Sequence, residues 1–153
     1  FSPYDASIGH FDSARVEWVS VVFMTMAGIS FLRYFVVLRS LSLRPITGDR
    51  EIHTYLAVLA VSVAVVMVLL LVHGVTSEPL EALRASAFHV VSLATTTGYA
   101  SGDYAQWPVF IPVLLMFLGC FASCAGSTGG GIKMVRMVLL VKQARRELVR
   151  IIH

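Results

Sequence analysis

The chain has 153 residues, of which 57% are hydrophobic and only 14% are charged, and its mean hydropathy is +0.79. Soluble globular domains are closer to half apolar and a quarter charged, so this composition excludes an ordinary soluble domain and indicates an integral membrane protein. The formal net charge is a modest +3, and we expect no nucleic-acid partner.

The first apolar segment, residues 16–38, follows a polar, loop-like stretch that begins at Phe1. That stretch contains no signal peptide, and we expect the chain to be a piece of a longer polypeptide. A membrane crossing takes roughly 20 residues, so residues 16–38 are predicted to span as one helix. Glu17 lies at its start, and Arg33 lies near its end, where a long side chain can reach the interface.

A second apolar segment, residues 55–72, carries no charge and is the clearest transmembrane helix, expected over residues 52–74. A shorter helix is predicted over residues 79–93, because Ser77 is a candidate cap and Pro79 suits a first helical turn. Its apolar part is too short to cross a bilayer, so we expect a re-entrant or interfacial helix.

The stretch SLATTTGYASGDY, residues 92–104, follows this short helix and is predicted to return to the outer surface as non-helical backbone. Backbone of this kind at membrane depth lines a wet cavity or is buried in protein. Its carbonyls, its threonine hydroxyls and the negative end of the short helix favour a cation, and the absence of carboxylates within the turn favours a monovalent ion over calcium. Two alternatives stay open: a loop that only seals a helix bundle, and an external loop.

The third apolar segment, residues 108–141, is too long for one crossing, since a straight helix of that length would measure about 50 Å. It contains the sequence GCFASCAGSTGGGIK, residues 119–133, and consecutive glycines disfavour a helix by roughly 1 kcal/mol each. We therefore predict a broken helix over residues 108–142, unwound in the middle of the membrane, where the loop obstructs or clears a pore. A basic end, residues 142–153, follows.

Other interpretations of this glycine-rich stretch fit less well. A phosphate-binding loop would need lysine where Ile132 stands, and a nucleophilic serine elbow around Ser127 would need glycine where Ala125 stands. A helix-packing motif would use Gly126 and Gly130 but leaves the adjacent glycines unexplained. Lys133 is either a functional charge within the membrane or a side chain that snorkels to the inner surface.

The basic residues orient the chain, since they concentrate in cytoplasmic loops. On this rule the N-terminus and residues 77–107 lie outside, and the C-terminus is cytoplasmic. Trp18, Tyr104 and Trp107 are expected in an outer aromatic belt. The residues on which the orientation rests are Arg39, Arg44, Arg50, Lys142, Arg145, Arg146 and Arg150.

The cysteines and histidines indicate neither a metal centre nor an enzyme. Cys120 and Cys124 are four apart, which predicts one face of one helix, and two thiols are too few for a zinc site. No two histidines have i,i+4 spacing, and we expect structural roles for them. They are His10, His53, His73, His89 and His153. No catalytic residue or cofactor is expected.

The order of these motifs resembles the Trk/Ktr/HKT superfamily of potassium transporters, most closely its bacterial Trk branch. TTTGY after a short helix, followed by GCFASCAGSTGGGIK and a basic end, carries the resemblance, which covers essentially the whole chain. Residues 55–141 resemble the third of four fused repeats, each a helix, pore loop and helix around one pore. Residues 1–38 resemble the end of the second filter loop and the following outer-to-inner helix.

The resemblance implies a role for each motif. Residues 1–50 would join the preceding pore loop to a cytoplasmic loop, and residues 51–153 would form a helix–pore loop–helix repeat. Potassium would bind at Thr96, Thr97, Gly98 and Tyr99, with Thr95 behind them, so that the filter segment is residues 95–99. Residues 119–133 would gate the pore, through Gly119, Gly126, Ser127, Thr128, Gly129, Gly130, Gly131 and Lys133.

The resemblance also implies potassium uptake across the bacterial inner membrane, as a multi-pass protein. The implied partners are the remaining repeats of the same polypeptide, a second full-length subunit in a dimer, and a cytoplasmic nucleotide-binding regulatory ring. Compared with the potassium-channel filter TVGYG, Thr97 replaces valine and Ala100 replaces the second glycine. Only one filter sequence is present, so a non-conducting membrane assembly or sensor module is the alternative.

Overall fold

The computed structural model describes residue 4 and residues 7–42, 44–102, 107–121 and 123–152, and over these residues it contains helices and no strands. Tyr104 of the predicted aromatic belt and His153 lie outside the described residues. The elements are the 3-10 helix η1 (Ser7–Phe11) and the helices α1 (Ala14–Ala27), α2 (Phe31–Ser40), α3 (Arg44–Thr47), α4 (Arg50–Val72), α5 (Pro79–Ala94), α6 (Phe110–Phe121) and α7 (Met134–Ile152).

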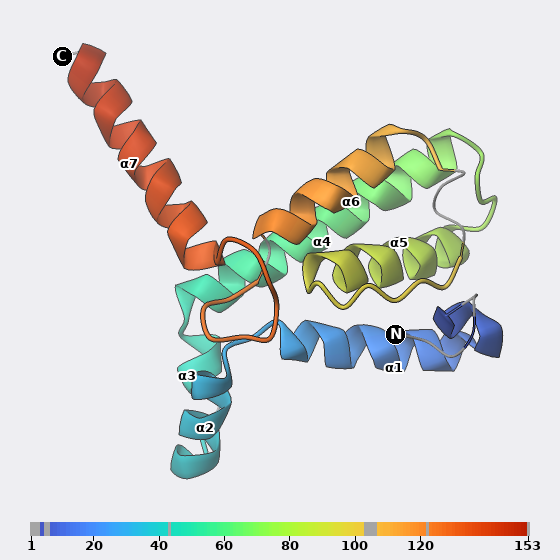
Figure 1. Cartoon of the computed structure of the whole chain (residues 1–153), viewed down its shortest axis with the longest axis horizontal. Coiled ribbons are helices and arrows are strands. Elements are labelled where there is room, and N and C mark those ends of the chain that lie inside the picture. The colour runs from blue at the N-terminus through green and yellow to red at the C-terminus, as the bar shows by residue number, and fades with distance from the viewer. Residues whose placement is uncertain (1–3, 5–6, 43, 103–106, 122, 153) are drawn as a thin grey trace.

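The short helix α5 lies at the centre of the fold. It packs against α1, α4 and α6, and Figure 1 shows it between α1 and the pair α4 and α6. Every residue from Ser86 to Ser92 is buried, so this part of the helix is enclosed on all sides and not only along one stripe, whereas the first turn is exposed. Glu78 precedes the first turn as its cap, in place of the predicted Ser77, and Pro79 is the first helical residue.

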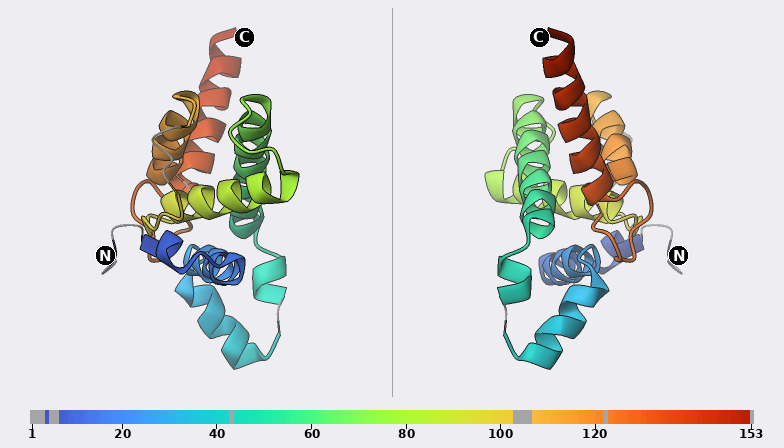
Figure 2. Two further views of the ribbon diagram at one scale, coloured as in Figure 1. Left: turned by 90° about the vertical axis from the view of Figure 1, so that its right-hand side faces the viewer. Right: turned by 90° about the vertical axis from the view of Figure 1, so that its left-hand side faces the viewer.

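One helix of the described residues, α4, is by itself long and apolar enough to cross a membrane. The helices α1 and α2 meet that test only when they are taken together, and α6 is a shorter apolar helix. The prediction that residues 16–38 form one continuous helix is wrong, because this segment is divided into α1 and α2, which meet at an angle of 89°. The chain turns at residues 28–30, and α2 leads away from the bundle (Figures 1 and 2).

Tertiary contacts stabilise this bend. The Tyr55 ring of α4 is fully buried against Gly28, and a Cβ added at Gly28 would overlap the Tyr55 hydroxyl. The same hydroxyl donates a hydrogen bond to the carbonyl of Thr25 at 3.1 Å. A glycine is therefore needed at the bend because an aromatic side chain from another helix occupies the space beside it.

We expect Tyr55→Phe to lower the free energy of unfolding by about 1 kcal/mol, because it deletes the buried hydrogen bond to Thr25 without opening a cavity. Tyr34→Phe is the matched control. Its hydroxyl donates to Met26 at 2.7 Å, but Tyr34 is only half-buried, so water can replace the bond. Thermal unfolding in detergent micelles measures both, and equal losses of stability would contradict the role of burial.

The last helix, α7, projects away from the bundle (Figures 1 and 2). It runs without interruption past Lys142, so the predicted basic end is not a separate segment but the C-terminal part of this helix. All residues from Leu139 to Arg150 are exposed. At the opposite side of the fold, the carboxylate of Glu17 on α1 lies 3.4 Å from the guanidinium of Arg84 on α5.

Candidate functional site

The five predicted filter residues directly follow α5. Thr95 is the cap at the end of the helix and is buried. Its hydroxyl donates to the Val91 carbonyl at 2.8 Å and lies 2.8 Å from the Thr97 hydroxyl. The Thr95 hydroxyl is therefore turned back to the helix, where it supports the segment instead of facing a ligand.

The next residues fold back over the last turn of α5. The backbone N–H groups of Thr97 and Gly98 donate to the Ser92 carbonyl at 2.9 and 3.2 Å. Ser92 in turn donates its hydroxyl to the Tyr99 carbonyl at 2.6 Å. One buried serine thus holds the middle and the last residue of the segment.

Two residues of the segment adopt left-handed backbone angles, and both are exposed. Thr96 has a φ of +57° and Gly98 a φ of +78°. Within the part of the chain that the structure describes, no donor bonds to the carbonyls of Thr96, Thr97 or Gly98. The segment therefore offers carbonyl oxygens next to the partly negative end of a helix, which is an arrangement suited to a cation.

The N-terminal residues lie against the residues that directly follow this segment. The N–H groups of Ile8 and Gly9 donate to the Ala100 carbonyl at 3.1 and 3.3 Å, and a Cβ at Gly9 would come within 2.6 Å of the Ser101 carbonyl oxygen. The beginning of the chain and the end of the filter segment are thus in direct contact, although more than ninety residues separate them.

The glycine-rich loop joins α6 to α7 and begins later than predicted. Gly119 lies inside α6, which continues to Phe121. A Cβ at Gly119 would lie 3.3 Å from the Leu93 carbonyl oxygen, so this glycine allows close packing of α6 on α5 and is not part of the loop. Cys124 lies beyond α6, and the prediction that both cysteines share one helix face is wrong.

The loop is closed at its base by backbone hydrogen bonds. Ile132 N–H donates to the Cys120 carbonyl at 2.7 Å, and Met134 N–H donates to the Ser123 carbonyl at 2.8 Å. The Ser123 hydroxyl donates to the Gly130 carbonyl at 3.0 Å. Lys133 is half-buried, and its ammonium donates to the Gly129 carbonyl of the same loop.

The structure brings the loop and the filter segment together. The N–H of Gly130 donates to the Thr96 hydroxyl at 2.9 Å. Gly129 is buried, and a Cβ there would come within 2.5 Å of Ser123 Cβ and 3.4 Å of the Thr95 carbonyl oxygen. Glycines in this part of the loop therefore allow its backbone to reach Thr95 and Thr96 at the start of the filter segment.

The loop also rests on the bend between α1 and α2. Cys124 N–H donates to the Gly28 carbonyl at 3.1 Å, and Phe31 N–H donates to the Gly126 carbonyl at 3.0 Å. The Thr128 hydroxyl donates to the carbonyl of Ala27 at 3.1 Å, whereas Ser127 donates to Cys124 within the loop. The bend thus exposes backbone groups that a continuous helix would have used internally.

One more contact, not foreseen from the sequence, joins the loop to α4. The Ala125 N–H donates to the Glu51 carboxylate at 2.7 Å. The sequence signal was weak: Glu51 is one of two acids, with Asp49, in a short stretch that also holds Arg44 and Arg50. The described residues include no group of three His, Cys, Asp or Glu side chains that could hold a metal ion, and buried His89 contacts the Ala85 carbonyl and the Trp107 ring.

A family model described as "TrkH: Cation transport protein" matches residues 1–153. The chain belongs to the TrkH family. It is 39% identical over its whole length to the Trk system potassium uptake protein TrkH of Escherichia coli K12, and 40% identical to the TrkH protein of Halomonas elongata. The resemblance inferred from TTTGY and the glycine-rich stretch is thereby confirmed.

A solved TrkH structure has the same fold. The crystal structure of the potassium transporter TrkH from Vibrio parahaemolyticus matches with a TM-score of 0.95 at 37% identity, covering 100% of this chain and 33% of that one. The chain spans 32% of the two curated TrkH relatives named above. The all-helical arrangement is therefore that of a continuous third of a TrkH-family transporter.

Proposed function

We propose that this chain forms one part of a membrane pore for potassium uptake. In this proposal α5 is a re-entrant pore helix, residues 95–99 are one quarter of the selectivity filter, and residues 123–133 are an intramembrane gate. Residues 1–50 connect this part to the preceding pore loop, and residues 51–153 form one helix–pore loop–helix repeat. The names of the TrkH relatives, which are potassium uptake proteins, support the choice of ion.

The observation that carries the proposal is the way α5 supports the filter segment. Ser92 accepts from two N–H groups of the segment and donates to the Tyr99 carbonyl, so the carbonyls of Thr96, Thr97 and Gly98 stay available. Such carbonyls can replace part of the water shell of a monovalent ion without holding it too tightly to leave. Potassium is the transported substrate in this proposal, and no cofactor in this chain takes part.

Contact with the N-terminal residues supports a pore built from several repeats. These residues resemble the end of a preceding filter loop, and Ile8 and Gly9 bond to Ala100 directly after the filter. Neighbouring filter loops around one axis would meet in this way. The other three quarters of the filter come, in this proposal, from the remaining repeats of the same polypeptide.

The proposed surroundings are a lipid bilayer and further protein subunits. The chain lies in the bacterial inner membrane with its N-terminus outside and its basic C-terminal helix in the cytoplasm, in agreement with the distribution of arginine and lysine. Full-length subunits form a dimer and are regulated by a cytoplasmic nucleotide-binding ring.

Rubidium uptake into vesicles that contain the complete polypeptide tests this function. We expect unlabelled potassium to compete with labelled rubidium far better than sodium does, and Gly98→Ser to reduce that preference by about tenfold, because a side chain strains the left-handed backbone at this position. Uptake that is absent in both proteins, or identical in selectivity, would instead favour a non-conducting assembly or sensor module.

A further inference from the structure

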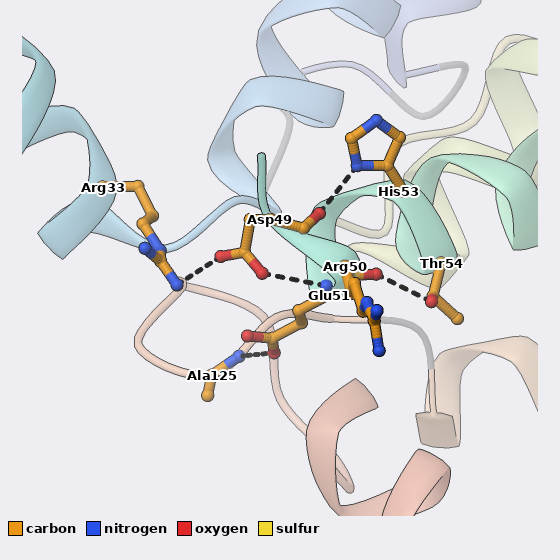
Figure 3. Close-up of polar contacts among 7 residues, drawn as sticks. All are labelled: Arg33, Asp49, Arg50, Glu51, His53, Thr54 and Ala125. Atoms are coloured by element: carbon orange, nitrogen blue, oxygen red, sulfur yellow. Dashed lines mark hydrogen bonds and ion pairs between the residues drawn. The ribbon is translucent and has the colours of Figure 1, made fainter. Parts of the chain in front are cut away.

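The first turn of α4 carries an acidic side chain that reaches out of its own helix to the glycine-rich loop. Figure 3 shows Glu51 and Ala125 in this contact, with the carboxylate accepting from the Ala125 N–H at 2.7 Å. The two residues are 74 positions apart in the sequence. A hydrogen bond to an ionised group is roughly twice as strong as one between neutral groups.

The backbone of Glu51 is also held in place, by the cap of its own helix. Asp49 caps α4, and its carboxylate accepts from the Glu51 N–H at 2.9 Å. The second oxygen of Asp49 lies 2.5 Å from the guanidinium of Arg33 on α2 (Figure 3). Glu51 therefore projects from a helix start that is itself fixed to α2, so its carboxylate is a stationary anchor for the loop.

The remaining contacts that hold the loop from outside are backbone groups and neutral hydroxyls. They involve Thr96 of the filter segment, and Ala27, Gly28 and Phe31 at the bend. Lys133 bonds only within the loop among the described contacts. Glu51 is thus the one ionised side chain, within the described part of the chain, that ties the loop to another element.

We propose that Glu51 is a positioning residue that retains the glycine-rich loop against the inner end of the filter, in the obstructing position. This inference rests on the proposed function, since it concerns the gate of that pore. The position of Glu51 at the junction of α2, α4 and the loop means that loss of its carboxylate frees the loop without altering any filter residue.

The test compares Glu51→Ala with Glu51→Gln in the complete polypeptide, in vesicles without any added regulator. The glutamine keeps an oxygen that can accept from Ala125 but loses the charge, so it should lie between wild type and the alanine variant. The alanine should raise rubidium uptake by about three- to tenfold, because the anchoring bond to a charged acceptor is lost from a partly exposed site. Glu147→Ala removes the same charge from the exposed face of α7 and is the matched control.

A second readout does not depend on ion flux. Cys124 is fully buried next to Ala125, whereas Cys120 on α6 is exposed and is replaced with serine beforehand, as are cysteines elsewhere in the polypeptide. We expect a water-soluble thiol reagent to modify Cys124 several-fold faster in Glu51→Ala than in wild type, with Glu51→Gln between the two.

The outcomes separate this inference from the proposed function. Faster Cys124 modification with no uptake in any variant would support the anchor and overturn the potassium pore. Normal wild-type uptake, with Glu51→Ala unchanged in both uptake and modification rate, would overturn the anchor and leave the pore intact. If the Glu51→Ala variant does not fold, Asp49→Ala takes its place, because it removes the acceptor for the Glu51 N–H and the partner of Arg33. Faster Cys124 modification in Asp49→Ala would then support the anchor, and an unchanged rate would overturn it.

Discussion

Gly98→Val is expected to abolish rubidium uptake, with a loss on the order of 100-fold, which corresponds to a barrier raised by about 3 kcal/mol. The backbone at Gly98 has a φ of +78°, and a β-branched residue reaches that region only with strain. A Cβ at this position meets no atom of the described residues within 4 Å. The valine therefore has room in the fold, but it turns the neighbouring carbonyls away from the ion and fills the space in which we place the pore.

Gly74→Val is the matched control for this experiment. Gly74 follows α4, has a φ of +67°, and likewise has no atom of the described part of the chain within 4 Å of an added Cβ. The two substitutions thus impose similar backbone strain in similarly open surroundings, one inside and one outside the filter segment. Measured side by side, equal uptake by the two variants would show that Gly98 is needed only for the turn and not for conduction.

Gly131→Ala is expected to have the largest effect on stability in the loop, lowering the free energy of unfolding by about 2–4 kcal/mol. Gly131 has a φ of +78°, and an added Cβ would lie 2.6 Å from the Cys120 carbonyl oxygen. That carbonyl already accepts the hydrogen bond from Ile132 at 2.7 Å, so it cannot move aside without breaking the base of the loop. A displaced loop should also increase rubidium uptake.

The adjacent Gly130 provides the comparison. A Cβ there would be 3.7 Å from the nearest atom, the Thr96 hydroxyl oxygen, which is ordinary contact. We therefore expect Gly130→Ala to stay close to wild type in both thermal unfolding in detergent and rubidium uptake. Gly131→Ala should differ from wild type in both measurements. Similar melting temperatures for the two variants would mean that the loop is not held at its base as the structure indicates.

The positions of most helices could be predicted from the sequence because their signals are local. Residues 55–72 are apolar without interruption, Pro79 marks a helix start, and consecutive glycines mark the break before α7. The bend after α1 could not be predicted in this way. A single Gly28 within an apolar run is compatible with a continuous helix, and the bend depends on Tyr55 and the loop, which are distant in the sequence.

The candidate site was predictable in composition but not in orientation. The sequence identifies Thr95 as part of a hydroxyl-rich segment, but only the fold shows that its hydroxyl is used by Val91. Gly119 belongs to the glycine-rich stretch in sequence but to α6 in the structure. A glycine is needed there because α6 packs closely against Leu93. Glu51 carries no motif at all, and its contact becomes visible only when α4 and the loop are placed together.

The central position of α5 affects how substitutions can change permeability and ion selectivity. Residues 86–92 of α5, just before the filter segment, are all buried, whereas most of residues 125–132 are exposed and held by single hydrogen bonds. Local opening therefore requires much less free energy in the loop than in α5. Substitutions that change how often the loop moves need not change which ion is preferred. Permeability and selectivity can therefore vary independently of each other.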